Sequence, residues 1–245
     1  MRAKTTIEWT EATWNPVTGC DKVSPGCAHC YAETFAERFR GVPGHPYEQG
    51  FDLKMWPDRL DGPLHWRRPR TIFVNSMSDL FHEGIPESYV YQVFDVMNAA
   101  QRHIFQILTK RHERLAAMAP RLPWTSNIWI GVSIENRRFV HRAEYLRKVP
   151  AAVRFISAEP LLGPLENLDL TGVDWLIAGG ESGPRHRPVD AEWIRHLRDR
   201  CREARVAFFF KQWGGLHPRS GGRTLDGREW SERPTPDLTR LIAAT

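Results

Sequence analysis

The chain has 245 residues, enough for one sizeable hydrophobic core, and its 41% hydrophobic content excludes an intrinsically disordered protein. The formal net charge of +5 and the pI of about 9.2 favour an anionic partner such as nucleic acid, although scattered arginines on a mildly basic enzyme would give the same charge. No apolar stretch approaches the ~20 residues of a membrane span and the first residues lack the apolar core of a signal peptide, so a cytoplasmic protein is expected.

Short apolar runs rich in β-branched and aromatic residues recur along the chain. They lack period-two alternation, which is typical of strands buried on both faces. The predicted strands are residues 71–74, 103–108, 127–132, 153–156, 173–178 and 206–210, with 13–17 as a possible first strand. The predicted helices between them are residues 87–100, 111–119, 137–148 and 191–204.

This alternation of strands and helices predicts right-handed βαβ units and a parallel sheet. About six to seven strands indicate an α/β fold, a partial or nearly closed parallel (β/α) barrel that forms a single domain over residues 1–245. A flat doubly wound sheet is the alternative. Residues 41–70, rich in Pro, Gly and Trp, are expected to be an insertion crossing the barrel mouth. From about residue 214 we expect an irregular tail with a short helix near 236–244.

Polar residues follow nearly every predicted strand. The clusters are residues 75–79, 109–111, 133–136, 157–160, 179–183 and 211–213. Because the carboxyl ends of parallel barrel strands form the active-site face, these clusters predict one converging site.

Three of the four cysteines lie close together, in the spacing C-x6-C-x2-C formed by Cys20, Cys27 and Cys30. In a cytosolic chain such clustering indicates metal binding rather than disulfides. Three thiolates on a cubane 4Fe–4S cluster leave one iron open, and S-adenosylmethionine could bind that iron. Structural zinc, completed by His29 or Cys201, is the alternative. Cys201 falls on the apolar face of a predicted helix, which favours a buried, inert thiol.

The frame of the cysteines resembles that of a known superfamily. Asn15-Pro16 and Gly19 precede Cys20, and Tyr31-Ala32 follow Cys30. This pattern resembles the cluster loop of radical S-adenosylmethionine enzymes, and among them the spore photoproduct lyase-like branch. The first interval is three residues longer than the C-x3-C-x2-C usual in the superfamily.

The whole chain resembles a family of phage-derived, three-cysteine-motif proteins of unknown function. The matching segments are residues 7–10, 14–16, 75–82, 157–163, 179–183 and 211–214.

The radical S-adenosylmethionine resemblance implies a 4Fe–4S cluster, bound S-adenosylmethionine, an external electron donor and a 5′-deoxyadenosyl radical. The expected cofactor-binding residues are Asn75, Ser76, Ser78, Asp79, Ser133, Glu135, Glu159, Gly179 and Gly180. Asp79 would face the methionine ammonium, unless it caps the following helix. The glutamates could instead form ion pairs with arginines. Lys211 and Glu181 are the candidate catalytic residues, although Lys211 could simply extend to water.

Basic and aromatic residues at the predicted barrel mouth favour nucleic acid as substrate, because Arg and Trp bind phosphates and stack on bases. The clusters are residues 110–112, 185–187 and 66–68. The leading hypothesis is therefore a radical enzyme that repairs DNA photoproducts or lesions, or modifies bases. The alternatives are a zinc-containing nucleic-acid-binding protein and a radical enzyme acting on a peptide or small metabolite. The sequence does not indicate the oligomeric state.

Overall fold

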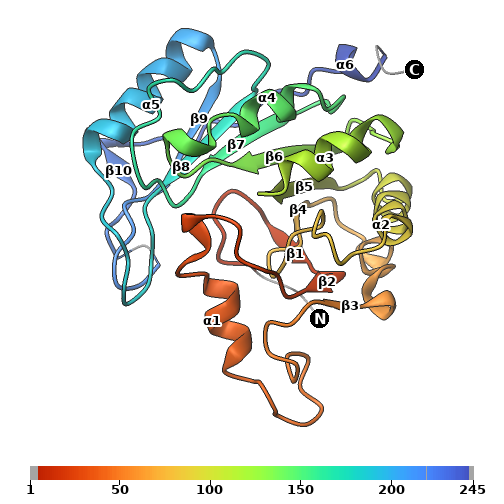
Figure 1. The fold of residues 1–245 in the computed structure, drawn as a ribbon. Helices are drawn as coiled ribbons and strands as arrows, with labels where there is room; N and C mark the ends of the chain where they lie inside the picture. Colours follow the sequence, from red (N-terminus) through yellow and green to blue (C-terminus); the bar gives the residue numbers. More distant parts are fainter. Residues whose placement is uncertain (1–4, 219, 243–245) are drawn as a thin grey trace.

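Seven parallel strands form one curved sheet in the computed structural model, which describes residues 5–218 and 220–242 (Figure 1). The strands stand in the sheet in chain order: β1 (Ala12–Trp14), β4 (Thr71–Val74), β5 (Ile104–Thr109), β6 (Ile128–Ser133), β7 (Arg154–Ala158), β8 (Trp175–Gly179) and β9 (Ala207–Gln212). The sheet curls into a half-barrel, which confirms the predicted fold class. Its strand order never reverses, so the doubly wound alternative is wrong.

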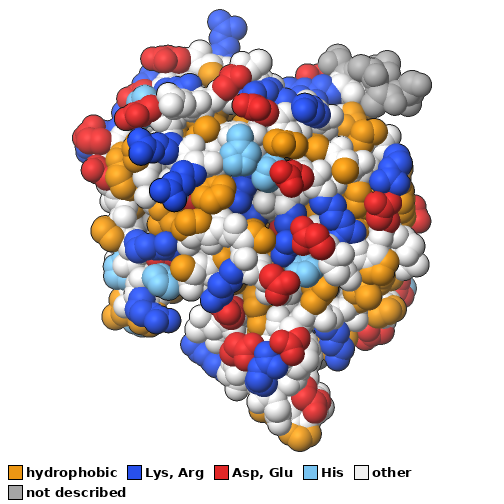
Figure 2. All heavy atoms as spheres, viewed as in Figure 1, with side chains coloured by type: hydrophobic (Ala, Val, Ile, Leu, Met, Phe, Trp, Pro, Cys, Tyr) orange, Lys and Arg blue, Asp and Glu red, His pale blue; other side chains and the backbone are white. Residues whose placement is uncertain are grey.

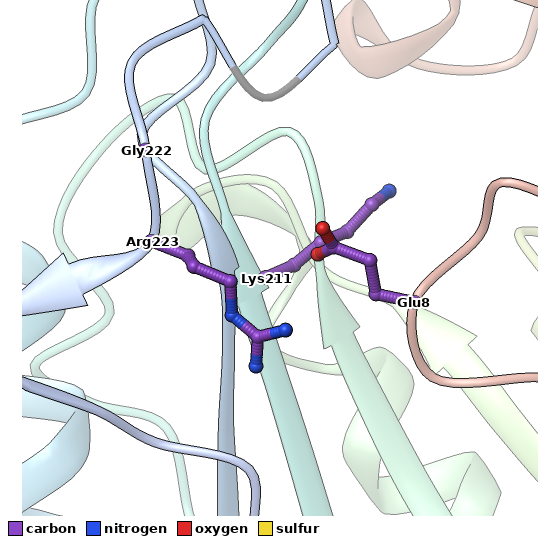
Figure 3. Close-up of a pocket in the computed structure, with 4 residues that line it drawn as sticks. All are labelled: Glu8, Lys211, Gly222 and Arg223. Atoms are coloured by element: carbon purple, nitrogen blue, oxygen red, sulfur yellow. The ribbon is translucent and has the colours of Figure 1, made fainter.

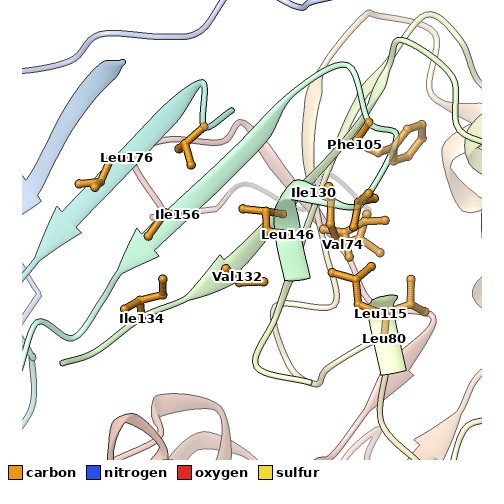
Figure 4. Close-up of a cluster of buried hydrophobic side chains, with 14 of the residues drawn as sticks. Val74, Leu80, Phe105, Leu115, Ile130, Val132, Ile134, Leu146, Ile156 and Leu176 are labelled. Atoms are coloured by element: carbon orange, nitrogen blue, oxygen red, sulfur yellow. The ribbon is translucent and has the colours of Figure 1, made fainter. Parts of the chain in front are cut away.

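Helices cover the outer, convex face of the sheet (Figure 1). They are α2 (Glu87–Ala99), α3 (His112–Met118), α4 (Arg142–Arg147) and α5 (Ala191–Ala204), with the short turn η4 (Ala119–Arg121) after α3. Figure 4 shows Val132 and Ile156 of the sheet in one buried cluster with Leu115 and Leu146 of the helices. This cluster is the main core.

The inner, concave face of the half-barrel has an aromatic floor. Trp9, from the segment before β1, packs there with its ring centroid 4.7 Å from Phe73 and 6.2 Å from Phe155. Because successive side chains alternate between the two faces, the concave row of each strand continues from these aromatics to polar residues at the carboxyl end. On β8, for example, Trp175 and Ile177 lead to Gly179 and then to Glu181.

Two predicted elements are wrong in their extent. The predicted strand 13–17 divides at Pro16, which has no N–H to donate to a ladder. The following β2 (Val17–Thr18) pairs antiparallel with β3 (Lys54–Met55), outside the barrel sheet. The predicted helix 137–148 is a short turn, η5 (Arg137–Phe139), followed by α4; the Asn136 side chain caps η5 by accepting a hydrogen bond from the backbone N–H of Arg138.

The segment 41–70 does not simply cross the mouth. Its first part packs Tyr47 and Phe51 against α1 (Tyr31–Glu37). Its second part, with η2 (Pro57–Arg59) and η3 (Gly62–His65), reaches the amino ends of the strands, where the Pro63 carbonyl lies 3.1 Å from His103 Nε2. Trp66 meets His103 there edge to face, with ring centroids 6.0 Å apart, so the prediction that residues 66–68 add to the mouth is wrong.

The tail after residue 214 is more regular than predicted. β10 (Thr224–Leu225) and β11 (Arg228–Glu229) form a hairpin, and its two turn residues have positive φ: 51° at Asp226 and 80° at Gly227. Asp-Gly is a favoured pair for this turn. A short helix, α6 (Thr239–Ile242), follows, whereas Ala244 of the predicted helix lies outside the described residues. None of the helices in the described ranges is long and apolar enough to cross a membrane.

Candidate active site

The three clustered cysteines lie on one loop, residues 20–30, here called the cysteine loop, beside the carboxyl ends of the strands. Backbone contacts fix its start, where the Gly19 N–H donates to the Met77 carbonyl (2.9 Å) after β4. The loop contains the turn η1 (Pro25–Cys27), and Cys30 precedes the first turn of α1. All three thiols are free and partly buried.

The thiols are close enough to act on one another electrostatically. Burial raises the pKa of Cys20 to about 12, and the negative charge of Asp79 adds to the effect while Arg111 opposes it. Burial also raises the pKa of Cys30, and Cys27 contributes to both shifts in the same direction. Without a bound cation the thiols of Cys20 and Cys30 therefore resist deprotonation, whereas a metal centre would hold them as thiolates.

Glu135, which follows β6, contacts the middle of the cysteine loop. Its side chain is fully buried; it accepts a hydrogen bond from Ser24 Oγ and lies 3.1 Å from Arg142 Nη1. A Cβ atom at Gly26 would lie 2.5 Å from Glu135 Oε1, so only glycine allows the loop to approach this closely. The additional residues between Cys20 and Cys27 thus fold over a buried carboxylate.

Glu181, which follows β8, holds the end of the same loop. One carboxylate oxygen lies 3.0 Å from His29 Nδ1 and accepts from the backbone N–H and Nε of Arg187, each at 2.9 Å. Arg187 also donates to the Pro25 carbonyl (3.0 Å). From the sequence, His29 was expected only as an alternative zinc ligand. Its position between two clustered cysteines was the signal for a role in the site.

The lowered pKa of Glu181 predicts that acid reduces the free energy of unfolding through this residue. Burial alone would raise its pKa, but hydrogen bonds from Arg187 and His29 lower it from 4.5 to about 2. Because the pKa is depressed, the stabilisation is present above pH 4.5 and is lost as the pH falls toward 2. Between about pH 6 and about pH 3, wild type should lose about 2 kcal/mol more free energy of unfolding than Glu181→Gln, measured by urea denaturation. Equal losses would contradict this reading; Glu144→Gln, at an exposed position on α4, is the control.

The four predicted residues after β4 have different surroundings. Ser78 Oγ donates to the Val17 carbonyl (3.0 Å), and Asp79 accepts from Thr109 Oγ1 (2.7 Å) and from the Lys110 backbone N–H (2.9 Å). These two side chains hold neighbouring segments together, and their contact with a cofactor stays a prediction. Ser76 Oγ donates to Asn15 Oδ1 (3.2 Å).

Asn75 differs from its neighbours because part of its side chain has no partner. It adopts a left-handed conformation (φ 58°), and its Oδ1 accepts from the Val17 N–H (3.3 Å). Its Nδ2 is buried and meets no hydrogen-bond acceptor among the described residues. A buried donor left unpaired is costly, so this atom suits an acceptor supplied by a bound molecule.

Lys211 of β9 and Glu159, which follows β7, form an ion pair. Lys211 Nζ lies 2.9 Å from Glu159 Oε1. Lys211 lines a cavity of about 410 Å³ together with Glu8, Gly222 and Arg223 (Figure 3). Gly179 lies against Glu159, since a Cβ there would be 3.2 Å from Oε1.

Gly180 has a packing role that the sequence did not indicate. A Cβ atom at Gly180 would lie 2.0 Å from the Trp213 carbonyl oxygen, so the neighbouring chain requires glycine there. Approach of a ligand to Gly179 and Gly180 stays a prediction.

Most basic residues near the mouth have internal partners. Lys110 Nζ donates to Ser133 Oγ (3.2 Å), Arg111 contacts Cys20, and Arg187 holds Glu181. Figure 2 shows Lys and Arg side chains interspersed with Asp and Glu over the face in view. Arg185 and His186 remain exposed. Fewer basic side chains at the mouth are therefore available to bind nucleic acid than the sequence predicts.

The donor set is compatible with an iron–sulfur cluster. No three His, Cys, Asp or Glu side chains in the described ranges meet closely enough to hold one metal ion. Tetrahedral zinc needs its sulfurs about 2.3 Å from one centre, whereas a cubane distributes its cysteines over separate irons. Three free thiols and the unpaired Asn75 Nδ2 are compatible with the larger group.

Comparison with known proteins identifies a family and a fold. A family model described as "Protein of unknown function (DUF5131)" matches residues 4–234. No curated protein matches. Among solved structures, spore photoproduct lyase complexed with dinucleoside spore photoproduct is similar, with a TM-score of 0.51, 14% identity, and coverage of 74% of this chain and 58% of that one.

A mutant of the same lyase with bound AdoMet and dinucleoside spore photoproduct gives a TM-score of 0.50 at 13% identity, covering 73% of this chain and 58% of that one. This chain thus spans less than two thirds of the length of those lyases. The likeness establishes a shared half-barrel fold.

Proposed function

The chain belongs to the DUF5131 family, whose description assigns no function, and we propose that it is a radical S-adenosylmethionine enzyme with a 4Fe–4S cluster bound by Cys20, Cys27 and Cys30. One observation carries the proposal: a loop with three partly buried thiols lies beside the carboxyl ends of a parallel half-barrel, tied there by Glu135 and Glu181. This is the face of such a barrel that carries active sites.

When bound and reduced, the cluster would supply the electron that cleaves S-adenosylmethionine to methionine and a 5′-deoxyadenosyl radical. The protein's own contribution is to position the reactants. Asn75 would donate from Nδ2 to the cofactor, and the pair Lys211–Glu159 would bind polar substrate groups beside the cavity. Glu181 and Glu135 would keep the cysteine loop in place.

Nucleic acid is the substrate class we propose, in a repair or base-modification reaction. The similar lyase structures contain a dinucleoside photoproduct, and the chain carries a formal net charge of +5. The test is an anaerobic assay of the reconstituted, reduced protein with S-adenosylmethionine and ultraviolet-irradiated or untreated oligonucleotides. Formation of 5′-deoxyadenosine that increases with an oligonucleotide supports the proposal. Formation that no oligonucleotide alters favours a peptide or small-metabolite substrate.

Binding of oligonucleotides should depend on salt. Neutralised phosphates release counterions, so affinity should fall steeply between about 50 and about 200 mM salt. Replacing the exposed Arg185 by Gln should reduce the slope of log K against log salt by about 1. Fluorescence anisotropy measures both values, with Arg67→Gln at the opposite end of the strands as the matched control. An unchanged slope for Arg185→Gln would remove this residue from the interface.

A zinc-containing nucleic-acid-binding protein remains the competing function. It requires three or four ligands around one ion, and the described side chains offer no such group. Metal analysis of anaerobically purified protein separates the two: stoichiometric zinc without iron would favour this competitor.

A further inference from the structure

Arg111 stands apart from the other basic residues of the site because it contacts a cluster cysteine directly. It lies between β5 and α3, and its side chain is only 6% exposed. Its Nη2 is 3.7 Å from Cys20 Sγ and 3.4 Å from the Asp21 carbonyl oxygen. Its Nη1 contacts Glu83, and its backbone N–H donates to Thr109 Oγ1 (2.8 Å). The guanidinium is thus fixed in orientation toward the sulfur.

We propose that Arg111 sets the reduction potential of the cluster by donating an N–H hydrogen bond and a positive charge to the Cys20 sulfur. The inference rests on the proposed function, since it requires a cluster at these cysteines. Hydrogen bonds to cluster sulfurs and nearby charges are two of the factors that determine such potentials. Reduction adds one negative charge to the cluster, so a buried cation in contact with a ligand sulfur stabilises the reduced form more than the oxidised form.

The charges around Cys20 show why Arg111 is needed there. Asp79, which is buried, lies near enough to oppose a negative charge on Cys20, and Cys27 acts in the same direction. Glu83 is 65% exposed, so solvent weakens its charge without removing it, whereas Arg111 is shielded from solvent. Asp21 is paired at 3.0 Å with His82. Arg111 is therefore the cation that offsets the buried carboxylate next to this ligand.

Redox titration of the reconstituted cluster, followed by electron paramagnetic resonance, tests the proposal. Arg111→Met should move the midpoint potential to more negative values, and Arg111→Lys, which keeps the charge but loses the planar fork, should give an intermediate value. Glu83→Gln should move it to more positive values, because it removes a negative charge beside Arg111. Since Glu83 is exposed, this variant keeps the test available if Arg111→Met fails to fold.

Arg121→Gln is the matched control, because Arg121 is exposed and pairs with Glu87 far from the cysteine loop. It should leave the potential unchanged. Identical potentials for wild type, Glu83→Gln and whichever Arg111 variants bind iron would overturn the inference about Arg111. Failure of the wild-type protein to bind an iron–sulfur cluster would instead overturn the proposed function.

Discussion

Replacing any one of Cys20, Cys27 and Cys30 by alanine is expected to abolish the iron–sulfur absorbance and the production of 5′-deoxyadenosine. In the proposed site each thiolate would hold one iron of the cubane, and no other cysteine in the described ranges lies on the cysteine loop to replace it. Iron content per chain and the optical spectrum after anaerobic reconstitution measure the effect.

The matched control is Cys201→Ala. Cys201 is buried in α5, and burial raises its pKa to about 12, with Glu232 adding to the shift. This thiol lies in the helical layer, so the variant should bind as much iron as wild type. Loss of iron from Cys201→Ala, or full iron in any of the three loop variants, would contradict the assignment of ligands.

The second large effect is expected from Glu135→Gln, which should lower the free energy of unfolding by about 3 kcal/mol. Arg142 is 2% exposed and loses its buried anionic partner in this variant. Burial already lowers the pKa of Arg142, and the Glu135 carboxylate opposes that shift. An uncompensated buried charge is the costly product. Urea denaturation of the apoprotein measures the loss.

A double variant separates the buried charge from other causes. Glu135→Gln combined with Arg142→Met removes both ions and should be less destabilised than Glu135→Gln alone, giving a coupling energy in a double-mutant cycle. Glu144→Gln, exposed on the same helix as Arg142, should change stability little. Additive effects of the two substitutions would show that the ion pair does not support the site.

The sequence was sufficient to predict the parallel sheet. Buried apolar runs separated by helical stretches predicted about six to seven strands, and the half-barrel has seven. The failures were local. The Asp226–Gly227 hairpin was missed although its turn pair was visible, and Trp66 was misplaced because the path of a long crossover is not encoded in its composition.

The roles of individual site residues were harder to predict, because one carboxylate can serve several partners. Asp79 was expected to face a cofactor, yet it accepts hydrogen bonds from Thr109 and Lys110. Glu135 was expected to bind the cofactor and Glu181 to be catalytic, and both side chains also hold the cysteine loop. Sequence spacing identifies which strand ends a residue follows, but partner choice depends on side-chain packing across the loop. Whether these residues also touch a cofactor stays a prediction.

The most direct test of the central claim is the response of the reduced cluster to S-adenosylmethionine in electron paramagnetic resonance. A cluster with three protein thiolates has one iron open to the cofactor. We predict a 4Fe–4S signal in the anaerobically reconstituted, reduced wild-type protein, and a change in its g values when S-adenosylmethionine is added. A signal that is unaffected by saturating S-adenosylmethionine, or the absence of any cluster signal, would contradict the account.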